Sequence, residues 1–309
     1  MRDAFATAAA WMEDGRSFAL ATLVALRDAA TAPIGTTIAV DTGGHIAGNI
    51  GAGCYEAEIV EACLQTAADG RARPVDINLA TEDELFGGAG CGAIMRVVAW
   101  RPERAFFDEA RAIAAGERDA TLSFTYENAD GSRELFEHVV PAKEMLILVG
   151  ATSLAAELAT IGRRLDFTVV VVDPRPAFGT KERVPNADVM VTEWPEDYLP
   201  KVLSARTSIV IVSHDPKFDL PALRSALRSD APYIGLLGSR RSQAARRESL
   251  RDEGFEGHAI VRIHGPAGLD IGGATVAETA LSILAEVVAN RHERLGVPLR
   301  ETRRAIHTR

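Results

Sequence analysis

A cysteine at the end of a glycine-rich turn is the first residue of this sequence whose position suggests chemistry. Cys54 follows the segment GNIGAG, in which Gly51 and Gly53 let the backbone approach a ligand closely. Residues 55–67 show the apolar spacing of a helix, so Cys54 is predicted at or near a helix N-cap. That position lowers the pKa of a thiol and offers N–H groups to an anion. A small buried cysteine in a tight turn explains the pattern equally well.

A second cysteine, Cys91, lies in the segment GGAGCG, and a strand is predicted after it over residues 93–99. A loop with so few side chains gives a cysteine little to pack against, so we expect Cys91 to be functional and Gly90 to lie beside a ligand. The third cysteine, Cys63, falls at an apolar position of the helix predicted over 55–67 and is expected in the core. The three cysteines fit no zinc spacing and no disulfide framework, which favours a reduced, cytoplasmic protein.

Residues 145–173 read as a strand, a turn, a helix and a second strand, which is the opening βαβ unit of a nucleotide-binding sheet. Gly150 would make the tight turn, and the following helix would present its N-terminus to an anion. Asp173 ends the second strand, where an acidic residue can accept ribose hydroxyls. Thr152 stands where a second glycine would let a pyrophosphate approach. A doubly wound sheet with an empty or altered crevice is therefore the alternative.

Further strands are predicted at 188–191, 208–213, 233–237 and 260–263, alternating with helices, so the sheet is expected to be parallel with helices on both faces. In such sheets ligands bind beyond the carboxyl ends of the strands. The candidate binding residues of this carboxyl edge are Gly150, Thr152, Asp173, His214, Asp215, Gly238, Ser239, Arg240, Gly268 and Asp270.

Several of these side chains have two interpretations. His214 could carry a proton or bind a phosphate, or it could only hydrogen-bond a neighbouring loop. Asp215 and Asp270 could orient ligand hydroxyls or only cap backbone N–H groups. Arg240 suits a phosphate, or it lies on the surface for solubility.

Three flanking features have one interpretation each. Asp219 is expected to cap the helix that follows, with Pro221 in its first turn. Arg246 and Arg247 are expected on a solvated helix face. Thr275-x-x-Glu278 predicts a capping box at the start of the closing helix.

Composition and length predict two globular domains. The chain has 309 residues, 47% of them hydrophobic and 25% charged. We expect an α/β protein with a small α+β N-terminal domain over residues 1–140 and a doubly wound Rossmann-like parallel-sheet domain over 141–309. The formal charge of −9 argues against nucleic-acid binding and against a polybasic membrane surface. No apolar run reaches the ~18 residues of a membrane span, and acidic residues interrupt the first 20 residues where a signal peptide is apolar.

Five segments together resemble the XdhC/CoxI family, the maturation factors of molybdenum hydroxylases such as xanthine and carbon monoxide dehydrogenases. They are GNIGAGCYE (48–56), GAGCG (88–92), SHDPKFD (213–219), YIGLLGSRRS (233–242) and GPAGLDIGGATVAETALSILAEVVANR (265–291). The resemblance implies a cysteine-bearing N-terminal domain and a C-terminal Rossmann domain. It also implies a chaperone without turnover of its own, which binds the molybdenum cofactor, assists sulfuration of the metal and hands the cofactor to an apo-enzyme.

For this chain the resemblance implies a ligand and partners. The cofactor would be molybdopterin or its dinucleotide form, and Cys91 and Cys54 would be the working thiols, with Cys91 at the metal. The partners would be an apo molybdenum hydroxylase, a cysteine desulfurase and a second copy of the chain in a homodimer. Three places differ from the family pattern. Ile50, Gly51, Ala52 and Gly53 precede Cys54, where the family is closer to Ser-Gly-Gly-Cys. Gly150, Thr152 and Ser153 replace its Gly-x-Gly-His loop, and Ile34 follows a proline where arginine is common.

A different class of function fits part of the sequence. The βαβ unit and Asp173 are also typical of an oxidoreductase that uses NAD(P), but that function leaves both glycine–cysteine loops unexplained. A purely structural protein without a ligand is a third interpretation.

Overall fold

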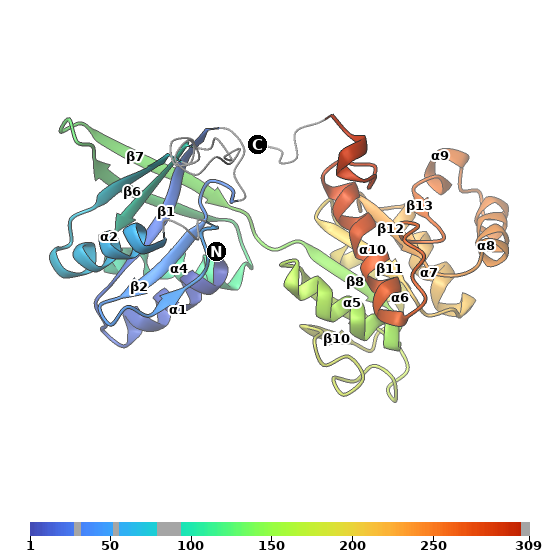
Figure 1. Cartoon of the computed structure of the whole chain (residues 1–309). Coiled ribbons are helices and arrows are strands. Elements are labelled where there is room, and N and C mark those ends of the chain that lie inside the picture. Colours follow the sequence, from blue (N-terminus) through green and yellow to red (C-terminus); the bar gives the residue numbers. More distant parts are fainter. Residues whose placement is uncertain (28–31, 52–55, 79–93, 304–309) are drawn as a thin grey trace. The chain divides into compact units, whose positions relative to one another are not determined.

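The chain folds into two compact units, Met1–Ala142 and Lys143–Arg303 (Figure 1). The computed structural model describes residues 1–27, 32–51, 56–78 and 94–303. Over these residues, no helix combines the length and the apolar character that crossing a membrane requires. Each unit has its own sheet and its own buried core, so each is described by itself.

The first unit is a small α+β fold. Its elements are α1 (Arg2–Glu13), β1 (Phe18–Arg27), β2 (Thr37–Asp41), β3 (Ile46–Ala47), α2 (Glu56–Asp69), β4 (Arg73–Asn78), β5 (Ile94–Trp100), the 3-10 turn η1 (Arg104–Phe106), α4 (Phe107–Ala115), β6 (Ala120–Glu127) and β7 (Arg133–Val140). Five strands pair antiparallel in the order β3-β2-β1-β5-β4, and β6 pairs with β7 as a separate hairpin.

Alternating side chains of the central strand β1 build the two cores of this unit. Ala19, Ala21 and Leu23 face α2, whereas Phe18 and Leu20 face α1, α4 and the β6–β7 hairpin. The polar side chains buried between the strands are paired: the Thr22 hydroxyl accepts the indole N–H of Trp100 at 3.0 Å and lies 3.0 Å from the hydroxyl of Thr37. Pairing removes the cost of burying these polar groups.

The second unit is a doubly wound α/β domain, as the sequence predicted. Its elements are β8 (Met145–Val149), α5 (Ser153–Arg164), β9 (Thr168–Val172), β10 (Val189–Val191), α6 (Pro195–Val202), β11 (Thr207–Ile211), α7 (Pro216–Leu227), β12 (Tyr233–Leu236), α8 (Arg240–Asp252), α9 (Gly257–Ile260), β13 (Ile263–His264), α10 (Val276–Arg291) and the 3-10 turn η2 (Leu299–Glu301). The strands pair parallel throughout in the order β10-β9-β8-β11-β12-β13, the order of a Rossmann domain.

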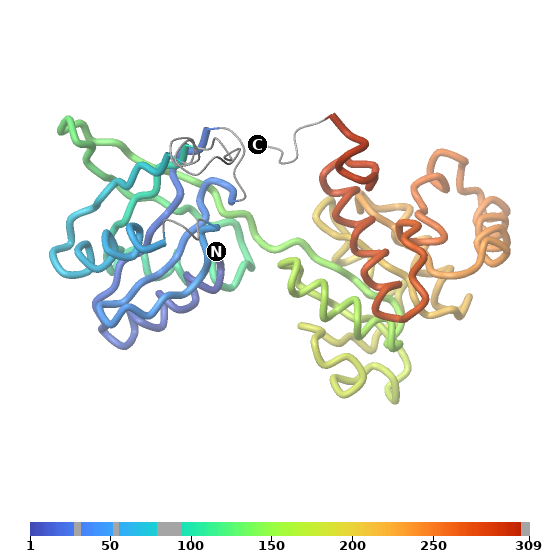
Figure 2. Tube along the Cα trace, viewed as in Figure 1, coloured from blue at the N-terminus to red at the C-terminus, as the bar shows by residue number. Residues whose placement is uncertain are grey.

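Helices cover both faces of this sheet. The core between the sheet and α5 with α10 contains Leu146 and Leu148 of β8, and the core on the side of α6, α7 and α8 contains Ile147 and Val149. Figure 2 shows α10, in red, running beside α5, in green. Because β8 is buried on both faces, its sequence is apolar without alternation.

Three local predictions differ from the structure. The strand β4 and the helix α6 were not predicted, and the last strand was predicted at 260–263. In the structure Gly257–Ile260 forms the short helix α9, and β13 comprises Ile263–His264. A short apolar run fits a buried strand and a buried helical turn equally well, so its spacing could not decide between them.

Candidate functional site

The carboxyl edge of the parallel sheet begins at the turn after β8. Gly150 has φ +107°, a left-handed conformation that L side chains rarely adopt. A Cβ at this position would lie 2.8 Å from the Cα of Ser213, in the loop after β11. Glycine is therefore needed both for the turn and for the close approach of these two loops, as the sequence predicted for a tight turn.

Thr152 caps the helix that leaves this turn. It has an extended backbone, and its hydroxyl accepts the N–H of Ala155 at 3.2 Å. The residue that stands in place of a second glycine thus satisfies one of the N–H groups of the first turn of α5. The positively polarised N-terminus of α5 still points to the carboxyl edge, where an anion is favoured.

Asp173, at the end of β9, is fully buried and accepts four hydrogen bonds. The donors are the N–H of Ala151 at 2.8 Å and, from Arg175, the backbone N–H at 3.1 Å, Nε at 2.9 Å and Nη2 at 2.7 Å. Burial alone would raise the pKa of Asp173, but these donors and the positive charge outweigh it and hold the pKa below its usual value. A carboxylate has about four lone-pair sites, so a ribose hydroxyl would have to displace a donor.

Two arginines meet at one aromatic ring beside this carboxylate. The guanidinium carbon of Arg175 lies 4.1 Å from the ring centre of Phe178 and 5.2 Å from that of Phe218. The guanidinium carbon of Arg183 lies 4.7 Å from the same Phe178 ring, and its Nε donates to the carbonyl of Ala151 at 3.2 Å. Arg175 and Arg183 were not among the residues predicted from the sequence, although an arginine two residues after a strand-ending acid was a usable signal.

Trp194 extends the aromatic surface. It follows β10 and is exposed, and its ring centre lies 5.4 Å from that of Phe218 at an interplanar angle of 44°. An exposed indole at the carboxyl edge offers a face on which a heteroaromatic ring can stack.

The loop after β11 holds two predicted binding residues. His214 is exposed and has φ +61°, an uncommon conformation for a residue other than glycine. Asp215 is the N-cap of α7, and its carboxylate accepts the N–H of Lys217 at 3.0 Å. The structure therefore gives Asp215 a capping role, while the ligand roles predicted for both residues stay predictions.

The prediction that Asp219 caps this helix is wrong. Pro216 occupies the first helical position, which sets the cap at Asp215 and leaves Pro221 inside the helix instead of in its first turn. Asp219 lies one turn further on and is buried, where it accepts the hydroxyl of Ser213 and pairs with Arg246.

The prediction that Arg246 and Arg247 lie on a solvated face is also wrong. Arg246 is buried against Asp219. Arg247 is half-buried and donates to the carbonyls of Ile260 at 3.3 Å and Ile263 at 2.7 Å. The aliphatic part of an arginine side chain can pack in the core, so its guanidinium group can bond to a buried acceptor on a neighbouring element.

The loop after β12 supplies the third group of predicted residues. Gly238 has φ +132°, and Ser239 caps α8 by accepting the N–H of Ser242 at 3.2 Å. Arg240 is exposed at the first position of α8. These positions agree with a turn that opens a helix at the carboxyl edge, and phosphate binding by Arg240 stays a prediction.

A partly buried carboxylate, that of Glu286, contacts the loop after β13. Glu286 of α10 accepts the hydroxyl of Tyr233 at 2.6 Å and the N–H of Gly268 at 2.7 Å, and its other oxygen lies 3.0 Å from Nδ1 of His264. Burial alone would raise the pKa of Glu286, but these partners hold it below its usual value. Gly268 has φ +114°, and Asp270 is exposed in the same loop.

The predicted capping box of Thr275 and Glu278 is confirmed at the start of α10.

The glycine–cysteine loops are mostly outside the described residues. Gly53, Cys54, Gly90 and Cys91 all lie there, so the roles predicted for them stay predictions. Gly51 is described: it is exposed, has φ +75°, and donates its N–H to the side chain of Asn49 at 2.6 Å.

The third cysteine is described and agrees with its prediction. Cys63 of α2 is fully buried, and burial raises the pKa of its thiol to about 12. Such a thiol stays protonated and is shielded from reagents at neutral pH.

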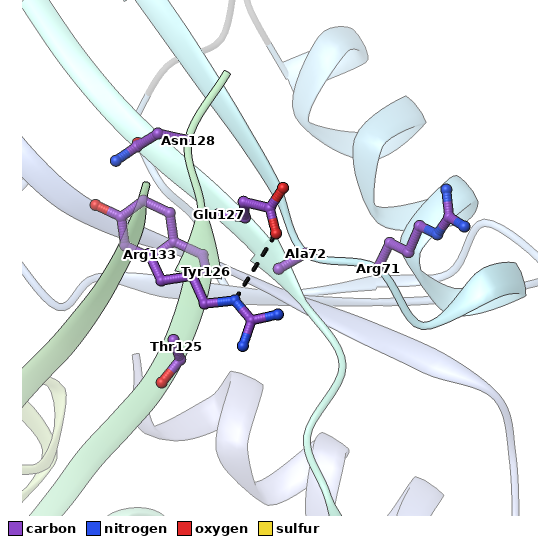
Figure 3. Close-up of a pocket in the computed structure, with 7 residues that line it drawn as sticks. All are labelled: Arg71, Ala72, Thr125, Tyr126, Glu127, Asn128 and Arg133. Atoms are coloured by element: carbon purple, nitrogen blue, oxygen red, sulfur yellow. Dashed lines mark ion pairs between the residues drawn. The ribbon is translucent and has the colours of Figure 1, made fainter. Parts of the chain in front are cut away.

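A hollow of ≈ 570 Å³ lies in the first unit. Figure 3 shows its lining, in which Arg133 is paired with Glu127 at 3.8 Å. The other lining residues are Arg71, Ala72, Thr125, Tyr126 and Asn128. Within the ranges that the structure describes, no three His, Cys, Asp or Glu side chains come together as a metal site. Most of the lining residues are polar, and none of the predicted site residues is among them.

The second unit thus defines the class of protein: a Rossmann-type binding domain with a cationic and aromatic carboxyl edge, joined to an α+β unit. Comparison with known proteins gives the family. Residues 146–287 match the family model described as the XdhC Rossmann domain, and residues 11–78 match that of the XdhC and CoxI family. The chain belongs to the XdhC and CoxI family.

Three known proteins resemble the chain over almost its whole length. A probable xanthine dehydrogenase subunit of Bacillus subtilis is 24% identical over 91% of this chain and 96% of its own. Molybdenum cofactor insertion chaperone PaoD of Escherichia coli is 24% identical over 90% of this chain and 84% of its own. The crystal structure of a xanthine dehydrogenase from Bacillus halodurans is 20% identical, covers 97% of this chain and 98% of that chain, and superposes with a TM-score of 0.76, which shows a shared fold.

Proposed function

We propose that this chain is a maturation factor of a molybdenum hydroxylase of the xanthine dehydrogenase type. It binds the molybdenum cofactor as cargo and passes it to the apo-enzyme. The observation that carries the proposal is the match of both parts of the chain to models of one family, together with a relative described as a molybdenum cofactor insertion chaperone.

The two ends of the cargo need different partners. The metal end is soft and sulfur-rich and suits thiolates, whereas the phosphate end is anionic and suits arginines and helix N-termini. Cys91 and Cys54 are the thiols that we assign to the metal end. The carboxyl edge of the second unit supports the assignment of the phosphate end, because Arg175 and Arg183 lie there beside the turn before α5.

Three finer features belong to the same proposal. The cargo is molybdopterin or its dinucleotide form, and it is sulfurated while bound to this chain, with a cysteine desulfurase as the sulfur donor. The chain acts as a homodimer. The cofactor form and the sulfuration step are tested by adding one component at a time to the transfer assay described next. The homodimer is tested by measuring the mass of the chain in solution.

The test is transfer of the cofactor to an apo-hydroxylase in a defined mixture. We expect the wild-type chain to activate the apo-enzyme, Cys91→Ser to abolish activation while the protein stays folded, and Cys54→Ser to reduce it. Cys63→Ser is the matched control, because this thiol is buried in the core. A Cys54→Ser/Cys91→Ser double variant with full transfer activity would remove both thiols from the mechanism.

An NAD(P)-dependent oxidoreductase is the second candidate, and the Rossmann strand order is the observation in its favour. Against it, the Asp173 carboxylate is already taken up by four protein donors. Thermal shift with NAD⁺, NADP⁺ and, for comparison, guanosine and cytidine diphosphates separates the two functions. Stabilisation by NAD⁺ or NADP⁺ at micromolar concentration that neither diphosphate produces favours the oxidoreductase.

A further inference from the structure

The loop after β9 carries an arginine pair that was not among the binding residues predicted from the sequence. Arg175 and Arg183 approach the same Phe178 ring, at 4.1 and 4.7 Å from its centre. Two like charges that share one ring repel each other unless an anion lies nearby. Arg175 has such an anion in Asp173, at 2.7 Å. Over residues 94–303 and the other described ranges, no carboxylate lies within ion-pair distance of Arg183.

Both guanidinium groups are held by hydrogen bonds, and each has N–H donors that these bonds do not use. Arg175 uses Nε and Nη2 on Asp173, and Arg183 uses Nε on the carbonyl of Ala151. A guanidinium has five N–H donors, so Nη1 of Arg175 and both Nη groups of Arg183 remain for a ligand. Stacking on Phe178 and the bonds to fixed acceptors reduce the entropy lost when these side chains bind an anion.

The pair lies at the position where a doubly wound sheet binds its ligand. β8 is flanked by β9 on one side and β11 on the other, and the chain order reverses there. Arg183 bonds to Ala151 in the turn after β8, while Arg175 reaches from the end of β9 to the ring of Phe218 in α7, beyond β11. The two guanidinium groups therefore lie at the point of the carboxyl edge where the strand order reverses.

We propose that Arg175 and Arg183 bind a phosphate group of the ligand, and that Asp173 positions Arg175 instead of accepting ribose hydroxyls. The ligand class is a phosphorylated compound with a heteroaromatic ring, selected by its phosphate. This inference rests on the proposed function only for the identity of the natural ligand, since the charge and the geometry belong to this chain.

Isothermal titration of the full chain with guanosine and cytidine diphosphates, and with the two unphosphorylated nucleosides, tests the inference. We expect the diphosphates to bind at least tenfold more tightly than the nucleosides, and the difference to shrink as salt is raised. Arg183→Gln should weaken diphosphate binding by about tenfold, Arg183→Lys by less, and neither should change nucleoside binding.

Arg228→Gln is the matched control. Arg228 is exposed in the same unit and lies 5.3 Å from the ring centre of Phe255, but it follows the C-terminus of α7, whose N-terminus is at the carboxyl edge. Its replacement should leave diphosphate binding unchanged. The inference is overturned if neither diphosphate binds, if nucleosides bind as tightly as diphosphates, or if Arg228→Gln weakens binding as much as Arg183→Gln.

Transfer assays on the same variants separate this inference from the proposed function. Unchanged diphosphate affinity in Arg183→Gln with normal activation of the apo-hydroxylase would remove the phosphate role and keep the maturation role. Failure of the wild-type chain to activate any apo-hydroxylase would remove the maturation role, whatever the titrations show.

Discussion

The second unit contains two buried aspartates that each pair with an arginine, and the two pairs end in different surroundings. Asp219 and Arg246 are 1% and 10% exposed, so this pair is buried between α7 and α8. Asp173 is 0% exposed, but its partner Arg175 is 36% exposed and borders the carboxyl edge. One aspartate–arginine pair is thus buried, whereas the other presents a fixed guanidinium group at the carboxyl edge of the sheet.

Breaking the buried Asp219–Arg246 pair should have the largest effect on the free energy of unfolding. Asp219→Ala leaves the Arg246 charge buried without a partner, and we expect a loss of about 3–5 kcal/mol in the free energy of unfolding. Urea denaturation followed by circular dichroism measures it. The Asp219→Ala/Arg246→Met variant should recover most of the loss, since no unpaired charge remains. A single variant that loses less than ~1 kcal/mol would show that solvent reaches Arg246.

Breaking the Asp173–Arg175 pair should lower the free energy of unfolding by less, and the size of this loss should depend on pH. Asp173→Asn removes the charge that holds Arg175, and we expect a loss of about 2 kcal/mol at neutral pH. The pKa of Asp173 is lowered in the folded chain, so its stabilising contribution is complete above the ordinary pKa of about 3.9 and is lost as pH falls below it. Urea midpoints from pH 3 to 7 should therefore converge for wild type and Asp173→Asn at the acid end. Parallel curves would mean that the carboxylate charge does not stabilise the fold.

The buried thiol of Cys63 gives a test of burial in the first unit. Cys63→Ser puts a hydroxyl into an apolar core, and we expect a loss of about 1–3 kcal/mol. Because the Cys63 thiol is buried and its pKa is raised to about 12, iodoacetamide at neutral pH should label Cys54 and Cys91 first and Cys63 only after unfolding. Mass spectrometry of timed samples gives the order, and early labelling of Cys63 would contradict its burial.

The smallest effect on the free energy of unfolding is expected for Arg183, whose side chain we assign to ligand binding. Arg183 is exposed and makes one hydrogen bond to a backbone carbonyl, so Arg183→Gln should change the free energy of unfolding by less than ~1 kcal/mol. The same urea series measures it. A loss comparable to that of Asp219→Ala would make Arg183 a structural residue of the loop after β9.

The sequence was sufficient where local chemistry decides the structure. The apolar strands around Gly150 predicted the parallel sheet, and the spacing of Thr275 and Glu278 predicted the cap of α10. It failed where distant contacts decide. The burial of Arg246 depends on how α8 packs beside Asp219, 27 positions earlier in the chain, and Arg183 reaches the carbonyl of Ala151, 32 positions earlier. Neither separation corresponds to a period of a helix or a strand.

The capping of α7 shows a failure of a different kind, because the needed signal was local. Asp215 and Asp219 are both suitable caps, and Pro216 decides between them: proline is favoured at the first helical position, where no N–H is required. The thiol loops could be proposed from glycine spacing alone, but Cys54 and Cys91 lie outside the described residues, so that part of the candidate site still rests on the sequence.

The central claim is that this chain carries a molybdenum-bound pterin to an apo-hydroxylase. The most direct measurement is the molybdenum and pterin content of the chain purified from cells that make the cofactor, before and after incubation with apo-hydroxylase. We predict that both are bound to the purified chain in equal amounts and that both move to the hydroxylase as its activity appears. A chain that carries neither pterin nor molybdenum, yet binds NAD⁺ or NADP⁺ saturably, would contradict the account.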